Sequence, residues 1–377
     1  MSCKVDVLIV GGGLAGLTAA LHLHKAGLEV ILIEKDEFPH HKVCGEYISN
    51  EVLPYLKWLD IDIAALKPTN IKKFELTTLQ QQRISTSLPL GGFGVSRYAL
   101  DHFLYKKLIE KGIKVIIDTV NDISFQENQF TVTTQLENQF IAKQVIGAYG
   151  KRATLDKKLN RLFIAKKSHY LAVKGHYKGN FRDDLVALHN FKGGYCGVSK
   201  VENGIINICY LADYNSFKTY KNIETYQKEV LYQNTSLKKI FEETEPIFDA
   251  PLTISQVSFV KKSKVENHIL MVGDTAGLIH PLCGNGMAMA IHSAKIASEL
   301  LILFFAKKIN SRMELENKYG KNWNKEFSGR IKMGNILSQL LRNDNIATLL
   351  FALLTKFPFL LTKIIKKTHG SKISIPL

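Results

Sequence analysis

Short apolar runs and helical periodicity alternate at the start of the chain. Residues 5–10 form an apolar, β-branched run that ends in glycines, which predicts a buried parallel strand. Residues 14–26 carry leucines at helical spacing, and Gly27 follows at the position of a helix C-terminal glycine. Residues 29–34 are a second apolar run. Strand, helix and strand within about thirty residues predict one βαβ unit.

Similar patterns return much later in the sequence. Helical spacing is seen at 98–111, and short apolar runs typical of buried strands occur at 113–117, 144–148 and 268–272. Alternation at 130–134 and 205–211 predicts antiparallel strands. From Asn285 onward the pattern is helical, and we expect breaks near Gly334 and Pro358.

These patterns predict an α/β protein with a discontinuous Rossmann-type domain. The predicted pieces of that domain are residues 1–70, 95–165 and 252–306. We expect a sheet-based substrate domain at 71–94 and 166–251, and a basic helical C-terminal region at 307–377. A chain of 377 residues is long enough for such a division.

The glycines after the first strand follow the pattern G-x-G-x-x-G. Gly11 permits a tight turn, Gly13 lets the backbone approach a pyrophosphate, and Gly16 lets the helix pack on the sheet. The helix N-terminus then offers free N–H groups to the phosphates. Glu34 closes the second strand about twenty residues later, where a carboxylate can bind a ribose hydroxyl. The motif predicts a dinucleotide without separating NAD from FAD.

A second glycine site decides between the two cofactors. Gly273-Asp274-Thr275-Ala276-Gly277 follows the run at 268–272, and Pro281-Leu282-Cys283-Gly284-Asn285-Gly286-Met287 comes next. Asp274 can accept hydrogen bonds from ribityl hydroxyls, and the later glycines can bring backbone N–H groups to a flavin ring. This G-D-x-A-G…P-x-x-G-x-G pattern resembles the second flavin-binding motif of the glutathione-reductase-like FAD superfamily. The cofactor it implies is FAD.

Three smaller matches narrow the resemblance. They are Lys42-Val43-Cys44-Gly45-Glu46, Arg97-Tyr98-Ala99-Leu100-Asp101 and Gly194-Tyr195-Cys196-Gly197-Val198. They resemble segments of geranylgeranyl reductases, within the group that includes para-hydroxybenzoate hydroxylase and the flavin-dependent halogenases. The resemblance implies an FAD-dependent oxidoreductase with Cys44 and Tyr195 as candidate catalytic residues, although Cys44 could equally be a small buried hydrophobe. The cofactor contacts predicted are Gly11, Gly13, Leu14, Ala15, Gly16, Glu34, Lys35, Cys44, Arg97, Val120, Gly150, Asp274, Gly284, Gly286 and Met287.

Departures from the family pattern favour one reaction over others. Tyr149 replaces the Asp of a D-G fingerprint before Gly150, which puts access of a nicotinamide in doubt. Gly277 stands where aromatic hydroxylases usually carry His, and the W-x-W-x-I-P motif of halogenases is absent from the sequence. We therefore expect reduction of C=C bonds in an apolar, polyprenyl or polyene-like substrate. An FAD-dependent monooxygenase and a non-catalytic prenyl-binding protein are the alternatives. The external reductant, NAD(P)H or another donor, is not assigned.

Charge and cysteine content bear on the surroundings of the protein. Residues 307–377 hold fourteen Lys or Arg against four Asp or Glu, an excess of ten, next to runs rich in Leu, Ile and Phe. This combination favours a reversible contact with an anionic membrane over nucleic acid, and the alternative is a solvated helix face. The apolar run at 346–361 is interrupted by Lys356 and Pro358 and is short for a span. Five scattered cysteines favour a reducing cytoplasm, with neither disulfides nor a metal site.

Overall fold

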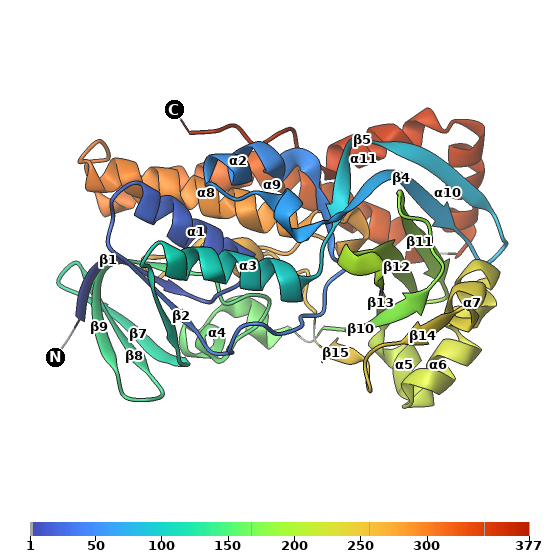
Figure 1. Cartoon of the computed structure of the whole chain (residues 1–377), viewed down its shortest axis with the longest axis horizontal. Coiled ribbons are helices and arrows are strands. Elements are labelled where there is room, and N and C mark those ends of the chain that lie inside the picture. Colours follow the sequence, from blue (N-terminus) through green and yellow to red (C-terminus); the bar gives the residue numbers. More distant parts are fainter. Residues whose placement is uncertain (1–2, 167, 256, 343, 377) are drawn as a thin grey trace.

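The computed structural model describes residues 3–166, 168–255, 257–342 and 344–376. Two sheets lie next to each other along the long axis of the molecule, and helices cover them (Figure 1). The first sheet lies at the end that holds the N-terminus, and the second lies beside α10 and the short helices α5 to α7.

The first sheet has a parallel core in the order β17-β9-β1-β2-β6. Every residue of β2 is buried, as expected for a parallel strand covered on both faces. A hairpin, β7 (Val120–Gln126) and β8 (Gln129–Thr134), continues from β9 by antiparallel pairing. The remaining strands are β1 (Cys3–Val10), β2 (Val30–Glu34), β6 (Lys114–Ile117), β9 (Gln139–Gly147), β16 (Val265–Glu266) and β17 (Ile269–Met271).

Long helices pack on this sheet. Helix α1 lies against both α3 and α8, and α8 in turn packs on α9. α1 ends with Gly27 at a φ of +82°, the left-handed conformation that a glycine adopts without strain after a helix. The bounds are α1 (Leu14–Lys25), α2 (Leu53–Trp58), α3 (Arg97–Glu110), α4 (Thr154–Lys158), α8 (Gly286–Phe305) and α9 (Arg312–Arg342). The βαβ unit and the helical and strand patterns of the sequence are confirmed.

The second sheet is mostly antiparallel and runs in the order β14-β10-β13-β12-β11-β4-β5-β3, with β15 also paired to β10. Its strands are β3 (Tyr47–Ser49), β4 (Thr69–Thr77), β5 (Arg83–Gly94), β10 (Tyr170–Gly179), β11 (Leu185–Phe191), β12 (Gly194–Lys200), β13 (Ile206–Asp213), β14 (Thr244–Pro246) and β15 (Leu252–Ser255). Strands β3 and β15 lie inside ranges that we assigned to the FAD domain. Their pairing partners are far away in the sequence, so local pattern could not place them. The division into domains otherwise stays a prediction.

Helices cover the two sides of the second sheet. α5 (Tyr214–Tyr220), α6 (Ile223–Glu229) and α7 (Thr235–Glu242) follow β13 on one side. α10 (Asp344–Lys356) and α11 (Phe359–Thr368) lie on the other, where Phe351, Leu361 and Ile365 join the apolar core beneath the sheet. The predicted break near Pro358 is confirmed, because α10 and α11 meet there at 113°.

The predicted break near Gly334 is wrong. Helix α9 runs through this position without interruption. A Cβ atom at Gly334 would lie 2.8 Å from the Sγ atom of Cys283 and 3.4 Å from the Cβ atom of His280. Gly334 thus lets α9 pack closely on the loop before α8, and it does not end a helix.

One helix in the described part of the chain, α8, is long and apolar enough to cross a bilayer. Of the most apolar 18-residue stretch of α8, 61 % is buried inside the molecule, as expected for a core helix. The pair α10 and α11 reaches the length of a span only as a strongly bent unit.

Candidate flavin site

The glycine-rich loop combines two structural glycines with one open position. Gly11 has a φ of +109°, and a Cβ atom there would lie 2.5 Å from the carbonyl oxygen of Ala148. A Cβ atom at Gly16 would lie 1.9 Å from the carbonyl oxygen of Gly11. At Gly13, by contrast, the nearest atom is Nη2 of Arg97, 3.7 Å away. Space is therefore kept free at Gly13, where a pyrophosphate is predicted to approach.

The N-terminus of α1 is open for an anion. No side chain caps it, so its first N–H groups are available to phosphate oxygens. Leu14 and Ala15 are buried, and a Cβ atom at Gly273 would lie 3.1 Å from the Cβ atom of Ala15. The first turn of α1 therefore contacts the second glycine motif.

Glu34 is held beside the glycine-rich loop. One carboxylate oxygen accepts a hydrogen bond from the amide of Gly12, and the other accepts from the amide of Asp36 at 3.1 Å. This fixes the carboxylate at the end of β2, where a ribose contact is predicted. Lys35, the next predicted contact, is exposed and forms an ion pair with Asp36 at 2.9 Å.

Arg97 faces the same space from the start of α3. Its guanidinium donates two hydrogen bonds of 2.7 Å to Asp101, and Lys42 pairs with Asp101 at 3.0 Å. Burial lowers the pKa of Arg97, but the charge and hydrogen bonds of Asp101, with a smaller contribution from Asp274, outweigh burial and raise the pKa of Arg97 above its ordinary value. Arg97 therefore stays charged and lies among predicted cofactor contacts from three separate segments.

Thr275, in the second glycine motif, is hydrogen-bonded to Gly150, which follows β9. The hydroxyl of Thr275 accepts from the amide of Gly150 at 2.8 Å and donates to the carbonyl of Gly150 at 3.2 Å. The hydroxyl of Tyr149 donates to the sulfur of Met271 at 3.5 Å, which directs this side chain toward β17. Tyr149 thus packs where the family pattern carries an Asp.

Three cations that the sequence motifs did not mark hold the loop around Asp274. Arg161 donates 3.0 Å hydrogen bonds to the carbonyls of Ser263 and Thr275. Lys262 donates to the carbonyl of Asp274, and Lys264 to that of Ala276, each at 2.8 Å. Burial lowers the pKa of Lys262 to about 8 and that of Lys264 to about 7. For the two lysines, the only sequence signal is the K-S-K segment just before β16, which does not reveal what they bind.

The loop before α8 holds the glycines for which we predict a flavin ring contact. Gly284 has a φ of +61°, and Gly286 begins α8 without a capping side chain. Met287 is buried in the first turn. A Cβ atom at Gly284 would lie 3.2 Å from the ring of Tyr47, so β3 packs against this loop. Val120, a predicted contact on β7, is buried in the core of the first sheet.

The two candidate catalytic residues come from different parts of the chain, the segment before β3 and strand β12. Cys44 is half-buried, and its carbonyl accepts a 3.2 Å hydrogen bond from Asn207 on β13. Tyr195 is buried, with its ring centroid 5.7 Å from that of His280. Burial raises the pKa of Cys209 to about 12, and burial also raises the pKa of Tyr195, with a smaller contribution from Cys209. No direct contact joins Cys44 to Tyr195 among the described residues.

A buried charge network ties the site to the second sheet. Glu46 accepts hydrogen bonds from Lys174 at 2.5 Å, from His176 at 2.7 Å and from the amide of Arg97 at 2.8 Å. Both Glu46 and Lys174 have 0 % exposure. Burial alone raises the pKa of Glu46, but the hydrogen bonds and charges of His176 and Lys174 hold it below the ordinary value.

Comparison with known proteins decides the family. Residues 4–308 match the FAD binding domain family, which is most of the chain. The chain belongs to this family. A digeranylgeranylglycerophospholipid reductase of Methanosarcina acetivorans is 25 % identical over 354 residues, covering 90 % of this chain and 85 % of the relative.

Solved structures show the same fold. A geranylgeranyl bacteriochlorophyll reductase-like protein of Thermoplasma acidophilum superposes with a TM-score of 0.75 at 20 % identity, covering 100 % of this chain and 94 % of its own. A flavin-dependent brominase superposes with a TM-score of 0.78 at 18 % identity. The superposition covers 98 % of this chain and 94 % of the brominase. Such likeness shows the fold and leaves the reaction open.

The protein is an FAD-dependent oxidoreductase, and its site fits that cofactor. The open position at Gly13, the two uncapped helix N-termini and the fixed charge of Arg97 would hold the phosphates and the ring. Bound FAD supplies the redox chemistry. In the described residues, no group of three His, Cys, Asp or Glu side chains could hold a metal.

Proposed function

We propose that the protein reduces C=C bonds of an apolar, polyprenyl-type substrate. The observation that carries the proposal is that both ends of the Lys42–Glu46 segment form ion pairs with residues of the site. Lys42 pairs with Asp101 beside Arg97, and Glu46 bonds to Lys174 on the second sheet. Cys44 lies between these anchors. The reductase relative that covers most of the chain supports the same reaction.

The apolar cluster of the second sheet would bind the substrate and exclude water. Tyr195, Leu188 and Leu211 lie on the buried apolar surface of the second sheet, together with Leu278 from the loop after β17, whereas Cys44 packs against the core of the first sheet. Such a surface favours a hydrocarbon chain over a charged substrate. Saturating one double bond takes a hydride and a proton, and Cys44 is the candidate to touch the reacting carbon atoms.

Anaerobic reoxidation tests the reaction. Chemically reduced protein mixed with a polyprenyl alcohol should return to oxidised flavin and leave one saturated bond per flavin. In air, the product should contain no added oxygen atom. Absorbance at the flavin band and the mass of the product measure both results.

Two cysteine variants sharpen this test. Cys44→Ala should slow reoxidation at least about ten-fold, as loss of a group at the reacting atoms does. Cys196→Ala is the matched control, because Cys196 packs in a separate cluster on the other side of the second sheet. Both variants should keep FAD. A strict need for oxygen, or a product heavier by one oxygen atom, would establish the monooxygenase instead. Stoichiometric FAD with no turnover of any polyprenyl probe would favour the non-catalytic prenyl-binding protein.

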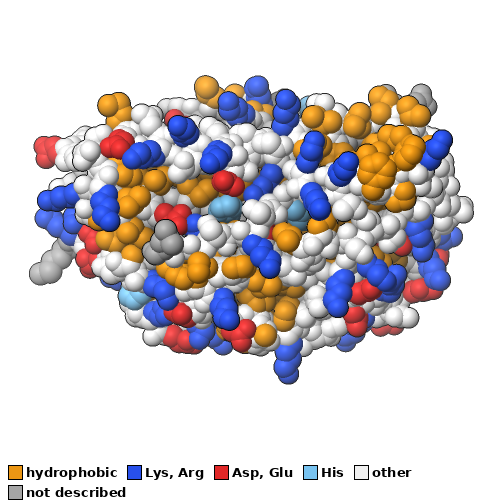
Figure 2. All heavy atoms as spheres, turned by 90° about the horizontal axis from the view of Figure 1, so that it is seen from above, with side chains coloured by type: hydrophobic (Ala, Val, Ile, Leu, Met, Phe, Trp, Pro, Cys, Tyr) orange, Lys and Arg blue, Asp and Glu red, His pale blue; other side chains and the backbone are white. Residues whose placement is uncertain are grey.

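We further propose that the protein docks reversibly on an anionic membrane from the cytoplasm. Exposed apolar side chains gather on α10 and α11 to form the α10–α11 patch, which consists of Ile346, Leu349, Leu353, Phe357 and Phe359. Figure 2 shows hydrophobic side chains clustered at the upper right, over this end of the molecule, with basic side chains at their edge. Lys356 and Lys363 lie over the rings of Phe357 and Phe359. Each such cation near an anionic surface contributes about 1 kcal/mol, and inserted apolar groups add to it.

Flotation with liposomes tests the docking. The protein should float with anionic vesicles, less so as salt rises, and stay unbound with neutral ones. Replacing Leu349, Leu353 and Phe359 with Ser should weaken binding by about ten-fold or more. The control replaces Leu136, Leu162 and Met313 with Ser, since these side chains are as exposed but lie elsewhere. Equal recovery of both variants with the vesicles would show that the patch has no role in docking.

A further inference from the structure

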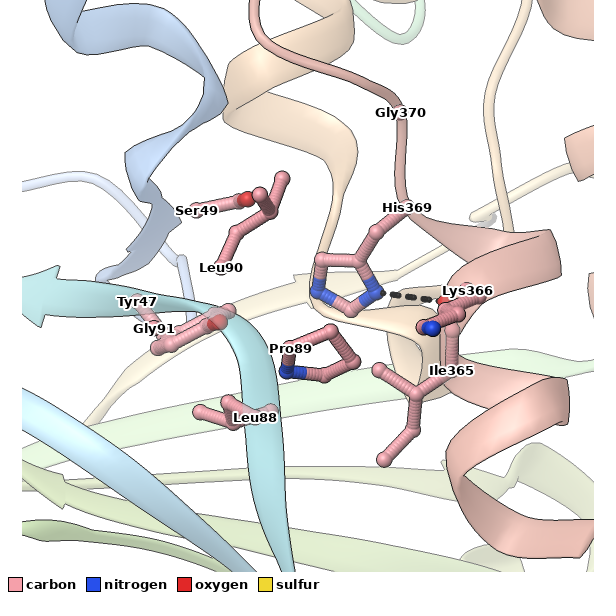
Figure 3. A pocket seen from close by; sticks show the side chains of 10 residues that line it. All are labelled: Tyr47, Ser49, Leu88, Pro89, Leu90, Gly91, Ile365, Lys366, His369 and Gly370. Carbon is pink, nitrogen blue, oxygen red and sulfur yellow. Dashed lines mark hydrogen bonds between the residues drawn. The ribbon is translucent and has the colours of Figure 1, made fainter. Parts of the chain in front are cut away.

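A cavity lies between the second sheet and the end of α11. It has a volume of about 140 Å³, similar to a cavity of about 150 Å³ that accepts a benzene-sized group. Figure 3 shows Leu88, Pro89 and Leu90 of β5 on one side, and Ile365 and His369 on the other. The walls are therefore mostly apolar. Pro89 and Lys366 are exposed, so the cavity reaches the surface at its rim.

Two polar atoms in this cavity have no hydrogen-bond partner among the described residues. They are the hydroxyl of Tyr47 and Nε2 of His369, and both are shielded from solvent. Their rings meet edge to face, with centroids 6.1 Å apart. Buried polar atoms are normally paired, so each of these two is available to a molecule bound in the cavity.

The two atoms differ in what they offer. Nδ1 of His369 lies 3.1 Å from the carbonyl of Ile365, which can only accept, so Nδ1 carries the proton and Nε2 is an acceptor. Burial lowers the pKa of His369 to about 4, which keeps the ring neutral. Burial also raises the pKa of Tyr47, which therefore keeps its proton and donates. One donor thus faces one acceptor.

Charge in and around the cavity disfavours an anion. Of its lining residues, only Lys366 is cationic, and its side chain is exposed at the rim. The nearby Arg330 already pairs with Glu51, whose carboxylate also accepts from the amide of Gly370 in the cavity wall. A hydroxyl can accept from Tyr47 and donate to His369 at the same time, without adding charge.

We propose that this cavity binds the hydroxyl end of a neutral apolar alcohol. The ring of Tyr47 also packs against Gly284, in the loop predicted to contact the flavin, so the cavity adjoins the redox site. The assignment rests on the proposed function, because it names the class of molecule on which the neighbouring redox site would act. Binding at the cavity requires no reduction.

Binding of three matched probes to the holoprotein tests this assignment. The probes are geraniol, its methyl ether, and the hydrocarbon with the same carbon chain. Calorimetric titration should show geraniol binding most tightly and the methyl ether about five-fold weaker, because the ether cannot donate to His369. The hydrocarbon should be weaker still. If geraniol fails to bind, or if all three probes bind equally, the assignment is wrong.

Variants locate the binding. Tyr47→Phe should weaken geraniol about five-fold, and His369→Leu should abolish the difference between alcohol and ether. Leu90→Trp should fill the cavity and block all three probes. Tyr214→Phe, an exposed tyrosine on α5, is the control and should bind as the wild type does. FAD content and thermal melting confirm that each variant is folded. Wild-type affinity in Tyr47→Phe and His369→Leu would overturn the proposal.

The outcomes separate this site from the proposed reaction. If the probes bind as expected but no polyprenyl alcohol reoxidises the reduced protein, the reaction is wrong and the site stands. If reoxidation occurs but Tyr47→Phe and His369→Leu bind geraniol as the wild type does, the reaction stands and the site is wrong.

Discussion

A Gly13→Val variant should fold and be colourless. The backbone at Gly13 has a φ of −82°, which any residue adopts, and only Arg97 lies within 4 Å of an added Cβ atom. The apoprotein therefore has room for the side chain, whereas the pyrophosphate does not. Losing two charge-assisted hydrogen bonds from the helix N-terminus weakens FAD binding by about 100-fold or more. Flavin absorbance and acid-released FAD measure the loss, and circular dichroism checks the fold.

Three further glycines serve as comparisons. Gly329→Val, on an exposed face of α9 with no atom near the added Cβ, should keep full FAD. Gly11→Ala and Gly16→Ala should lose the fold itself, because an added Cβ atom clashes with backbone at both positions. Stoichiometric FAD in Gly13→Val would show that the pyrophosphate is bound elsewhere.

Replacing Glu46 with Leu should destabilise the protein by about 3–5 kcal/mol. The change leaves the fully buried ammonium of Lys174 without its carboxylate, and an unpaired buried charge is costly. Chemical denaturation followed by circular dichroism measures the loss. Glu245→Leu, at an exposed position on β14, is the matched control and should change stability by less than about 0.5 kcal/mol.

A compensating change separates charge from packing. The double variant Glu46→Leu with Lys174→Met should recover most of the lost stability, because no unpaired charge remains. The pKa of Glu46 is lowered in the folded protein, so its contribution is present above the ordinary value of 4.5 and is lost as the pH falls through the folded value. The wild type should therefore lose stability relative to the double variant in acid. Equal stability of Glu46→Leu and the wild type would mean that the network does not hold the sheets together.

The sequence predicted those parts of the site that depend on local backbone chemistry. Gly11, Gly13 and Gly16 follow a strand and open a helix, and this local order is enough to predict a phosphate loop. Gly334 shows the limit of the same reasoning, because its role depends on Cys283 and His280 across the packing interface. A glycine within a helical pattern ends a helix or admits a neighbour, and the sequence alone does not decide which.

The partners of the buried charges on the second sheet could not be predicted. Lys174 and His176 lie on β10 in alternate, inward-facing positions where a strand pattern leads one to expect apolar residues. Their partner Glu46 is 128 residues from Lys174 in the sequence. The cavity beside Tyr47 is similar, since His369 comes from the end of the chain. Such pairings follow from the fold, and a single sequence carries no record of them.

The discontinuous first sheet has a consequence for biosynthesis. Strand β9 ends at Gly147, but its neighbour β17 begins only at Ile269, after the whole second sheet has been made. Asp274, Thr275 and the N-terminus of α8 follow later still. A ribosome adds about 5–20 residues per second, so an emerging chain holds an incomplete flavin site for many seconds. Cofactor capture must come late in translation or after release, and a prematurely terminated chain that stops before β17 is made as a colourless fragment.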